Sequence, residues 1–443
     1  MGQEKEYQRL VGFTKTKLLQ PNEEQEFIQT IDMENMKSYD EQTASWILET
    51  GRYTIRVGNS SRNTKIVAYI DIEDNIIFER VQNICKLDYK INEIEPENKL
   101  QEFEDDVPVL TFSQEQIEKN IINYEQEGNN IVKEIIDKFS LEELCDIVCG
   151  AHHKEKEEIK YYDSIVPGAA GETTSNLKEK YGITNLILAD GPAGVRLQKE
   201  YKENEKDVYQ YCTAMPIGTL LAQTWNEEIL QSVGFGIGRE MDEFGISIWL
   251  APGMNIHRDP LCGRNFEYLS EDPFLTGIVA SNIILGLQKN YGTGATIKHF
   301  ACNNKEQNRV YDNSILSERA LREIYLRGFE IAVKLSEPVA VMTSYNNINN
   351  VPTANSHDLC TKVLRNEWGF KGVVMTDWFE ATIGTSIPSK AIKAGNDLMM
   401  PGHFLDTEEL KKSVHDGTLK IEDLKRSAIN ILNVILNSNK YEK

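Results

Sequence analysis

The chain has 443 residues, of which 40% are hydrophobic and 26% charged, with a formal net charge of −21. Because domains usually hold about 100–200 residues, this length predicts two or three domains, or one large barrel with an attachment. The acidic balance argues against nucleic-acid binding, which needs a basic surface. No apolar run reaches the roughly 18 residues of a membrane-spanning helix, and the seven scattered cysteines favour reduced thiols. We therefore expect a soluble cytoplasmic protein without membrane association.

Residues 1–73 are expected to form a β module. The segments EEQEFIQTIDM (23–33) and GRYTIRVGNSSRNTKIVAYIDI (51–72) alternate apolar and polar positions between Gly, Asn and Asp turns. About 70 residues supply only three to five strands, whereas a complete sandwich has about seven. The module is thus expected to be partial: it either borrows a partner sheet or lacks its first strands in this chain.

Residues 74–130 are interpreted as an acidic linker followed by a helix. The stretch 93–106 contains seven acidic residues and one Lys, which is typical of a solvated connector. A helical pattern begins after Phe112. Another helix start is predicted at Ser140, because Ser140 can cap the helix and Glu143 follows three residues on.

Residues 131–443 are predicted to form a (β/α) barrel of the TIM type with one or two irregular units, which makes the fold class α/β. Amphipathic helices, such as those expected at 225–245 and 317–335, alternate with short apolar runs at 185–190, 247–252, 295–300, 340–345, 372–377 and 397–402. Continuous apolar strands between helices indicate a parallel sheet covered on both faces. Neither a Gly-rich fingerprint after the first strand nor a P-loop is present, which disfavours a nucleotide-binding sheet. The glycines in GFGIG (234–238) lie within a predicted helix and are expected to allow close packing.

Polar residues end several of these predicted strands. They include Asp190, the pair Lys298 and His299, Tyr345, and Asp377 with Trp378 behind it. A single strand-end Asp is commonly a helix cap. In a (β/α) barrel, however, the carboxyl ends of all strands form one rim, where the active site is built. The pattern therefore predicts one pocket that gathers these side chains.

The mixture of residue types favours sugar chemistry. No His, Cys or Asp cluster has metal-ligand spacing, and the adjacent His152 and His153, expected on a helix, would point apart, so no metal and no cofactor is predicted. A G-x-S-x-G turn for a serine nucleophile is absent. Lys298 could form a Schiff base with a carbonyl substrate. The hydrogen-bonding groups around Lys298, and a carboxylate beside Trp378, are more typical of a site that holds a hydroxylated ring.

Four longer motifs carry a resemblance to a known family. The runs APGMNIHRDPLCGRNFEYLSEDPFLTG (251–277), TIKHFACNNKEQNR (296–309), SERALREIYLRGFE (317–330) and GFKGVVMTDW (369–378) closely resemble glycoside hydrolase family 3, the β-glucosidase type. This resemblance covers about residues 140–443. Residues 7–73 resemble the latter part of the family's fibronectin type III-like domain.

The resemblance implies roles for individual residues. Asp377 matches the nucleophile that forms a covalent glycosyl-enzyme intermediate with retention of configuration. The hydroxyl ligands of the terminal sugar match Asp190, Arg264, Lys298, His299 and Arg309, while Tyr345 lies near the nucleophile and Trp378 borders the pocket. From the residues alone, Arg264 could instead be a structural ion-pair partner of Glu267 or Asp272.

The family comparison also implies what this chain lacks. The β module precedes the barrel, the reverse of the commoner order, and no segment corresponds to the α/β sandwich domain that supplies the general acid/base. We expect Met1 to be an internal or artificial start, and the absent sandwich domain or a second copy of the chain to be the partner.

The expected function is a retaining, exo-acting β-glycosidase for small or oligosaccharide β-glycosides, with β-glucosidase favoured over β-xylosidase. Two alternatives stay open: a sugar-binding fragment or pseudo-enzyme, and a Schiff-base aldolase that uses Lys298.

Overall fold

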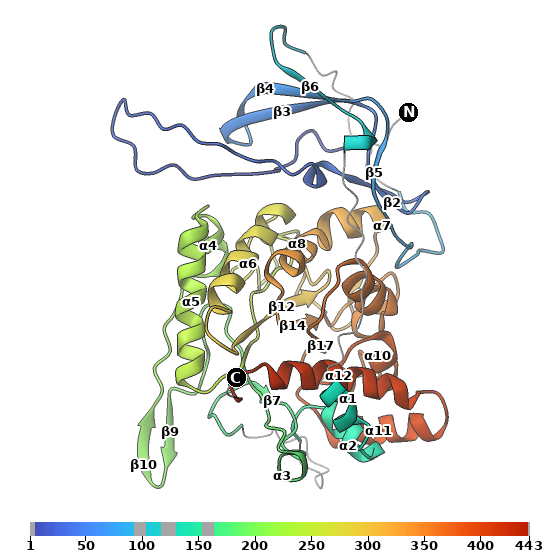
Figure 1. Ribbon diagram of the computed structural model, residues 1–443. Coiled ribbons are helices and arrows are strands. Elements are labelled where there is room, and N and C mark those ends of the chain that lie inside the picture. Colours follow the sequence, from blue (N-terminus) through green and yellow to red (C-terminus); the bar gives the residue numbers. More distant parts are fainter. Residues whose placement is uncertain (1–4, 93–102, 117–129, 153–163, 442–443) are drawn as a thin grey trace.

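The computed structural model describes residues 5–92, 103–116, 130–152 and 164–441. A small β module lies against the helices of a larger part, in which helices surround a curled sheet (Figure 1). The sheet has the strand order β17-β14-β12-β11-β8-β7. Its strands are β7 (Gly171–Glu172), β8 (Ile187–Ala189), β11 (Ile248–Trp249), β12 (Gly294–Phe300), β14 (Ala340–Thr343) and β17 (Val373–Met375).

The barrel prediction is confirmed in part. Strands β8, β11, β12, β14 and β17 pair in parallel and fall within five of the predicted apolar runs, whereas β7 is antiparallel to β8. Beyond β17 only single bridges continue the pairing, from Met375 to Leu398, from Met399 to Cys149 and from Gly150 to Thr173. The sixth run contains Pro401, which cannot donate to a strand ladder. The regular strands therefore form a curled half-barrel.

Both faces of this sheet are covered by apolar side chains. Alternate strand residues point to opposite faces, and the two buried clusters divide them accordingly. Ile187, Trp249 and Val341 belong to one cluster, while their neighbours Leu188 and Ile248 belong to the other. Because neither face meets water, the strands are continuous apolar runs, as the sequence predicted.

Helices α5 (Glu227–Glu243), α6 (Pro273–Leu287) and α8 (Arg327–Ser336) cover one flank of the sheet (Figure 1). The predicted close packing is confirmed at Gly234, where a Cβ atom would lie 2.0 Å from the carbonyl oxygen of Ile283 in α6. Helix α2 (Leu141–Ile147) begins with the predicted capping box of Ser140 and Glu143. The second predicted helix, 317–335, is divided into α7 (Glu318–Ala320), a π-helical turn η3 (Leu321–Tyr325) and α8.

The other elements of the larger part are short connections and the helices near the C-terminus. These are α1 (Asn130–Ile136), α3 (Lys178–Tyr181), β9 (Glu200–Glu203), β10 (Lys206–Tyr209), α4 (Gly218–Ala222), β13 (Asn313–Ser314), β15 (Asn347–Ile348), β16 (Val351–Pro352), the 3-10 helix η4 (Thr353–Asn355), the π-helix η5 (Asp358–Glu367), α9 (Glu380–Ile383), α10 (Pro388–Ala394), α11 (Phe404–His415) and α12 (Ile421–Leu436).

The β module contains two three-stranded sheets. One comprises β1 (Ser38–Asp40), β2 (Ser45–Leu48) and β5 (Ile76–Arg80); the other comprises β3 (Gly51–Ser60), β4 (Asn63–Ile72) and β6 (Val109–Phe112). The hairpin predicted over 51–72 is confirmed by the pairing of β3 with β4. Strands β5 and β6 lie beyond residue 73 and contribute to the same two sheets. Most of the acidic stretch 93–106 lies outside the described residues.

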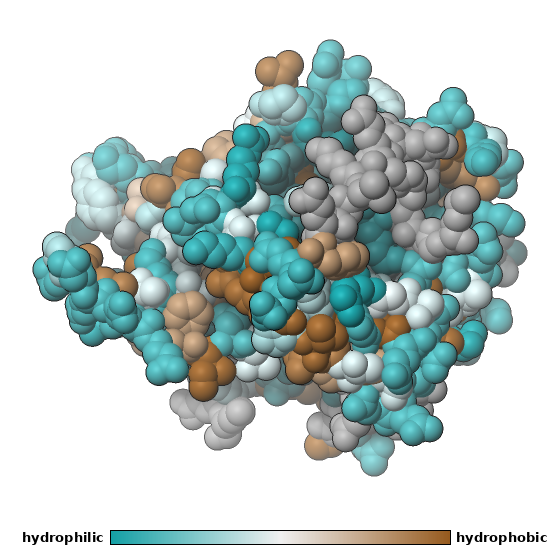
Figure 2. All heavy atoms as spheres, turned by 90° about the horizontal axis from the view of Figure 1, so that it is seen from above, coloured by the Kyte–Doolittle hydropathy of each residue, from teal (hydrophilic) through white to brown (hydrophobic). Residues whose placement is uncertain are grey.

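The strand predicted at 23–33 is wrong. Described residues up to 32 form no strand, and Met33 opens a 3-10 helix, η1 (Met33–Met36). The alternation of this segment has no buried face behind it, since Ile28 is 94% exposed. After β6, the described part of the predicted helix consists of the 3-10 helix η2 (Gln114–Gln116) and α1. Seen from the side of the module, the surface is mostly hydrophilic with apolar side chains in between (Figure 2).

A buried ionic cluster joins the module to the larger part. Arg322 in η3 donates to Glu318 at 2.8 Å, to Glu367 at 2.7 Å and to the carbonyl oxygen of Gln82 at 2.9 Å. Tyr39 of β1 donates its hydroxyl to Glu318 at 2.7 Å. Because these side chains are almost fully buried, each depends on its partners for the polar contacts that water would otherwise make.

None of the described helices is long and apolar enough to cross a membrane. All seven cysteines lie within the described residues, and none forms a disulfide.

Candidate active site

A pocket of about 1050 Å³ opens at the carboxyl ends of the parallel strands. All eight residues singled out from the sequence line it: Asp190, Arg264, Lys298, His299, Arg309, Tyr345, Asp377 and Trp378. They come from the ends of β8, β12, β14 and β17 and from the loops that follow β11 and β12. The structure therefore brings together side chains that are up to 188 positions apart in the sequence, from Asp190 to Trp378.

Asp377 presents one unengaged carboxylate oxygen. The backbone N–H of Trp378 donates to Oδ1 of Asp377 at 2.7 Å. Oδ2 has no hydrogen-bond partner among the described residues and lies 3.6 Å from Nε2 of His299. Burial raises the pKa of Asp377, although the Trp378 N–H and the charges of Arg264, Lys298 and Arg309 oppose the rise. Oδ2 is thus the oxygen that remains available for a bond to a substrate atom.

His299 is held beside Asp377 as a neutral ring. Its Nδ1 lies 3.1 Å from the hydroxyl oxygen of Tyr268, and its backbone N–H donates to Asn255 Oδ1 at 3.0 Å. Burial lowers the pKa of His299 well below its usual value, and the charges of nearby Arg264 and Lys298 lower it further. A neutral imidazole can offer hydrogen bonds here without neutralising the Asp377 carboxylate.

Asp190 and Lys298 form the charged side of the pocket. Nζ of Lys298 lies 2.8 Å from Asp190 Oδ1, and Arg196 Nη2 lies 2.5 Å from Oδ2. Burial by itself raises the pKa of Asp190, but the Lys298 and Arg196 charges outweigh it and leave the pKa lowered. Asp190 is therefore an ionised acceptor. The ion pair also engages Lys298, which weakens the Schiff-base hypothesis.

Two arginines and two aromatic rings complete the wall. Arg264 pairs with Glu267, as the structural alternative expected, yet it also lines the pocket. Arg309 lies 4.8 Å from the ring centroid of Tyr345. The Tyr345 hydroxyl donates to the carbonyl oxygen of Trp378 at 2.7 Å, and Trp378 Nε1 donates to the carbonyl oxygen of Ala170 at 2.9 Å. These bonds set the orientation of both rings before any ligand arrives.

One supporting residue escaped the sequence reasoning. Glu380 is buried, and its Oε1 accepts the backbone N–H of Asp377 at 3.0 Å and the hydroxyl of Thr343 at 3.3 Å. Burial and the neighbouring Asp377 charge raise the pKa of Glu380 well above its usual value. An acidic residue three positions after Asp377 was the available signal, since a side chain at that spacing can reach back to a backbone N–H.

The structure shows no metal centre in the part it describes. No three His, Cys, Asp or Glu side chains of these residues are gathered as ligands. His152 was expected on a helix but lies in a loop, where its Nδ1 is 2.9 Å from the carbonyl oxygen of Gly150. His153 lies outside the described residues.

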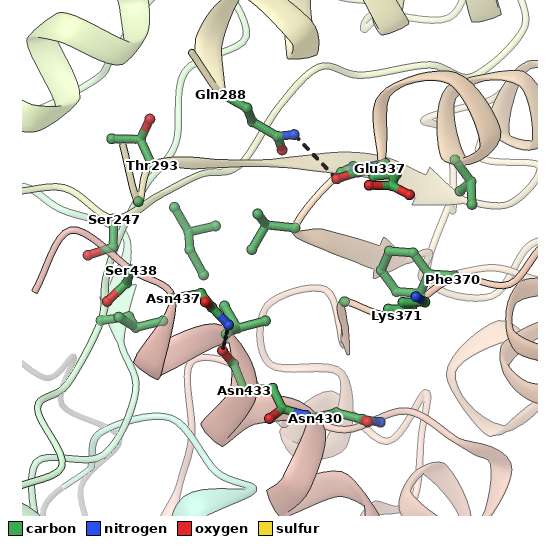
Figure 3. A pocket seen from close by; sticks show the side chains of 18 of the residues that line it. Ser247, Gln288, Thr293, Glu337, Phe370, Lys371, Asn430, Asn433, Asn437 and Ser438 are labelled. Carbon is green, nitrogen blue, oxygen red and sulfur yellow. Dashed lines mark hydrogen bonds between the residues drawn. The ribbon is translucent and has the colours of Figure 1, made fainter. Parts of the chain in front are cut away.

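A second cavity, of about 1090 Å³, lies at the opposite ends of the strands (Figure 3). Ser247, Thr293 and Gly372, which directly precede β11, β12 and β17, line it. Its amide side chains bond locally: Gln288 donates to the carbonyl oxygen of Glu337, and Asn437 to that of Asn433. None of the residues singled out from the sequence is here. Since this face of a barrel serves stability rather than chemistry, the pocket around Asp377 is the candidate site.

Two family models match the chain. The model of the glycosyl hydrolase family 3 N terminal domain matches residues 143–434, and that of the fibronectin type III-like domain matches residues 2–61. The resemblance drawn from the sequence motifs is therefore confirmed.

Named relatives match both parts of the chain. Beta-glucosidase A of Butyrivibrio fibrisolvens is 37% identical over 94% of this chain and 52% of its own length. A beta-glucosidase of Ruminococcus albus is 35% identical over 97% of this chain and 46% of its own length. The chain spans about half the length of the curated relatives it matches.

Solved structures agree. That of a beta-glucosidase from Paenibacillus barengoltzii is 35% identical and covers 93% of this chain and 47% of its own, with a TM-score of 0.75. Beta-glucosidase 3B from Thermotoga neapolitana, solved in complex with glucose, is 45% identical over 70% of this chain and 43% of its own, with a TM-score of 0.65.

Proposed function

We propose, from the premise that this chain belongs to glycosyl hydrolase family 3, that it is the barrel portion of a retaining, exo-acting β-glucosidase with Asp377 as the nucleophile. The observation that carries the proposal is the unengaged Oδ2 of buried Asp377 in a pocket lined by hydroxyl-binding groups. The glucose complex of the Thermotoga neapolitana relative supports glucose as the sugar.

In the proposed reaction, Asp377 Oδ2 attacks the anomeric carbon while the bond to the leaving oxygen breaks. A covalent glycosyl ester forms, and water then attacks the same carbon and releases Asp377, so that two inversions retain the configuration. The transition state resembles an oxocarbenium ion, which the carboxylate stabilises. Arg264 and Lys298 oppose the effect of burial on Asp377 and so favour its ionised form.

The remaining pocket residues are proposed to bind the sugar hydroxyls. Asp190 is an acceptor, while Lys298, Arg309 and Arg264 are donors with fixed positions. Trp378 is proposed to offer its ring face to the sugar ring, since its indole N–H is already bonded to Ala170.

The proton for the leaving group is proposed to come from outside the described residues. The carboxylates that line the pocket are Asp190, Glu267 and Asp377, and the first two already form ion pairs. A general acid contributes about 10²–10⁴-fold to the rate. The proposed source is an α/β sandwich domain or a second copy of the chain, and we expect slow turnover of alkyl glycosides by this chain.

Trapping tests the proposal. Incubation with 2,4-dinitrophenyl 2-deoxy-2-fluoro-β-glucoside, whose leaving group needs no protonation, should add one fluoroglucosyl unit, which peptide mass mapping should place on Asp377. The matched Asp377→Asn variant should remain unlabelled. Label on another residue, or none on the wild-type chain, would contradict the proposal. Faster labelling by the corresponding xyloside would favour a β-xylosidase.

The same samples separate the alternatives. A chain that binds glucose without acquiring label would be a sugar-binding pseudo-enzyme. Borohydride trapping of a carbonyl substrate on Lys298 would identify the aldolase instead.

Three structural expectations belong to the same proposal. Residues 131–443 act as one (β/α) barrel, which the single bridges beyond β17 complete. Residues 1–73 belong to the fibronectin type III-like module, and 74–130 connect the two. The cytoplasm is the proposed location, because seven cysteines without a disulfide fit a reducing compartment.

A further inference from the structure

We propose that Tyr211 and Phe266 form a second sugar subsite at the mouth of the pocket, which binds the ring next to the one held at Asp377. The proposal rests on the proposed function and specifies its substrate class as β-linked gluco-oligosaccharides. Both residues line the same pocket as Asp377, yet they are 67% and 51% exposed.

Tyr211 follows the β9–β10 hairpin, which projects from the body of the protein (Figure 1). Its ring is stacked on that of Tyr209, with centroids 5.9 Å apart and an angle of 4° between the planes. Nζ of Lys199 lies 5.8 Å from the Tyr211 ring centroid. These contacts orient the ring but cover little of it, so burial in a core does not explain an aromatic residue here.

Phe266 lies on the loop after β11, and its backbone is anchored. The hydroxyl of Thr219 in α4 donates to the carbonyl oxygen of Asn265 at 2.9 Å, and the N–H of Thr219 donates to that of Phe266 at 3.3 Å. The next residue, Glu267, is buried and paired with Arg264. The loop is thus fixed on its inner side, while the Phe266 ring stays exposed at the pocket.

Exposed aromatic faces at this place suit a sugar ring. The C–H faces of a pyranose are apolar, and burying them against a flat ring removes apolar surface from water. The polar groups at the pocket floor are occupied with one another and with Asp377, so the mouth differs from the floor in kind. A ring at the floor would place its glycosidic oxygen toward the solvent side, where the next ring meets the aromatic residues. Tyr209, which is 50% exposed, extends the platform outward for a third ring.

Binding of unreactive ligands tests the subsite. Glucose, thio-linked cellobiose and thio-linked cellotriose can be titrated calorimetrically, because sulfur in the linkage suppresses cleavage. The wild-type chain should bind thiocellobiose more tightly than glucose. Tyr211→Ala and Phe266→Ala should each weaken thiocellobiose binding about tenfold and leave glucose binding unchanged, in line with the worth of one aromatic contact. Tyr209→Ala should weaken only thiocellotriose binding.

Two further variants serve as controls. Tyr211→Phe keeps the ring and should bind thiocellobiose as the wild type does. Tyr7→Ala removes a tyrosine that is also 67% exposed but does not line the pocket, and it should change nothing.

The outcomes are separable from those of the proposed function. If Tyr211→Ala and Phe266→Ala leave the ratio of thiocellobiose to glucose affinity unchanged, the subsite is refuted while the pocket floor stands. If the wild-type chain binds glucose and thiocellobiose equally, the subsite is likewise refuted. If it binds neither and Asp377 acquires no fluoroglucosyl label, the proposed function fails and the subsite with it.

Discussion

Asp377 owes its reactivity to the short turn that follows it. The backbone N–H of Trp378 occupies Oδ1, and Glu380 accepts the backbone N–H of Asp377 itself, so only Oδ2 is left without a bond. Phe379, between them, has a φ of 64°, the left-handed conformation that turns the chain back toward Asp377. The nucleophile is therefore positioned by its own chain neighbours as well as by the opposite wall.

Replacing Glu380 should separate positioning from packing. Glu380→Gln keeps an oxygen acceptor for the Asp377 N–H, whereas Glu380→Ala leaves this buried donor unsatisfied, at a cost of about 1–3 kcal/mol. We expect labelling of Asp377 by the fluoroglucoside to slow about tenfold or more in the Ala variant and to stay near the wild-type rate in the Gln variant. Equal labelling rates in both variants would show that Glu380 does not position Asp377.

The pH dependence of the same labelling reports on Asp377. Burial raises the pKa of this carboxyl above its usual value, and only the ionised form attacks. The labelling rate should therefore fall as the pH drops through this raised pKa. The midpoint should lie above the value of about 4 that a free aspartic acid shows. Rapid-quench mass spectrometry across pH 3–8 would measure it, and a midpoint below 4 would contradict the expectation.

At the scale of elements, the loops after the strands bring the pocket together. The loop after β8 contributes Asp190 and, beyond β10, Tyr211, while the loop after β11 contributes Arg264 and Phe266. Parallel strands direct all such loops to one edge of the sheet. The sequence order of these residues therefore reflects the order of the strands.

The start of α11 should make stability depend on pH. Asp406 is buried and accepts the backbone N–H of His403 at 3.0 Å. Burial raises the pKa of Asp406 to about 7, the neighbouring Glu409 adds to the rise, and the His403 N–H opposes it. Between pH 4 and 7 the unfolded chain loses this proton while the folded chain keeps it, so the contribution of Asp406 to stability falls as the pH rises.

Asp406→Asn removes this titration and retains an acceptor for the helix cap. We expect the free energy of unfolding of the wild type, relative to this variant, to drop by about 1–3 kcal/mol from pH 4.5 to 7.5. Urea unfolding at the two pH values measures the difference. Parallel changes in wild type and variant would mean that Asp406 titrates alike in both states.

At the scale of the whole molecule, the module and the larger part meet through buried charges. Arg322 satisfies Glu318 and Glu367 together and lies 4.6 Å from the ring centroid of Tyr39 in the module. Removing one partner of a buried ion pair leaves an uncompensated charge, which costs about 3–5 kcal/mol. The two parts are therefore expected to unfold together.

Arg322→Met should lower the free energy of unfolding by about 3–5 kcal/mol, measured by urea unfolding followed by circular dichroism. Lys411→Met, which removes a more exposed partner of Glu408, should cost less than about 1 kcal/mol. A loss at Arg322 as small as that at Lys411 would show that the cluster contributes little to joining the two parts.

Much of this molecule was accessible from the sequence, because its determinants are local. Five apolar runs became the parallel strands, since buried strands need no polar face, and Ser140 with Glu143 formed the expected cap, since both partners lie within one helical turn. The pocket residues follow the strands directly, so the parallel topology places them at one edge. The roles assigned to them rest on the family resemblance and stay predictions.

Other features depended on contacts between distant segments. The alternation at 23–33 resembled a strand but lacks a neighbouring strand and a buried face, and pairing partners are chosen only in the folded chain. Whether Arg264 was a structural or a pocket residue could not be decided from spacing; folded, it is both, because Glu267 orients it from beneath. The sequence by itself determined the elements and the residue types of the site. The tertiary structure decided which oxygen of Asp377 is unengaged and which aromatic rings remain exposed, because burial and pairing arise only when the loops meet.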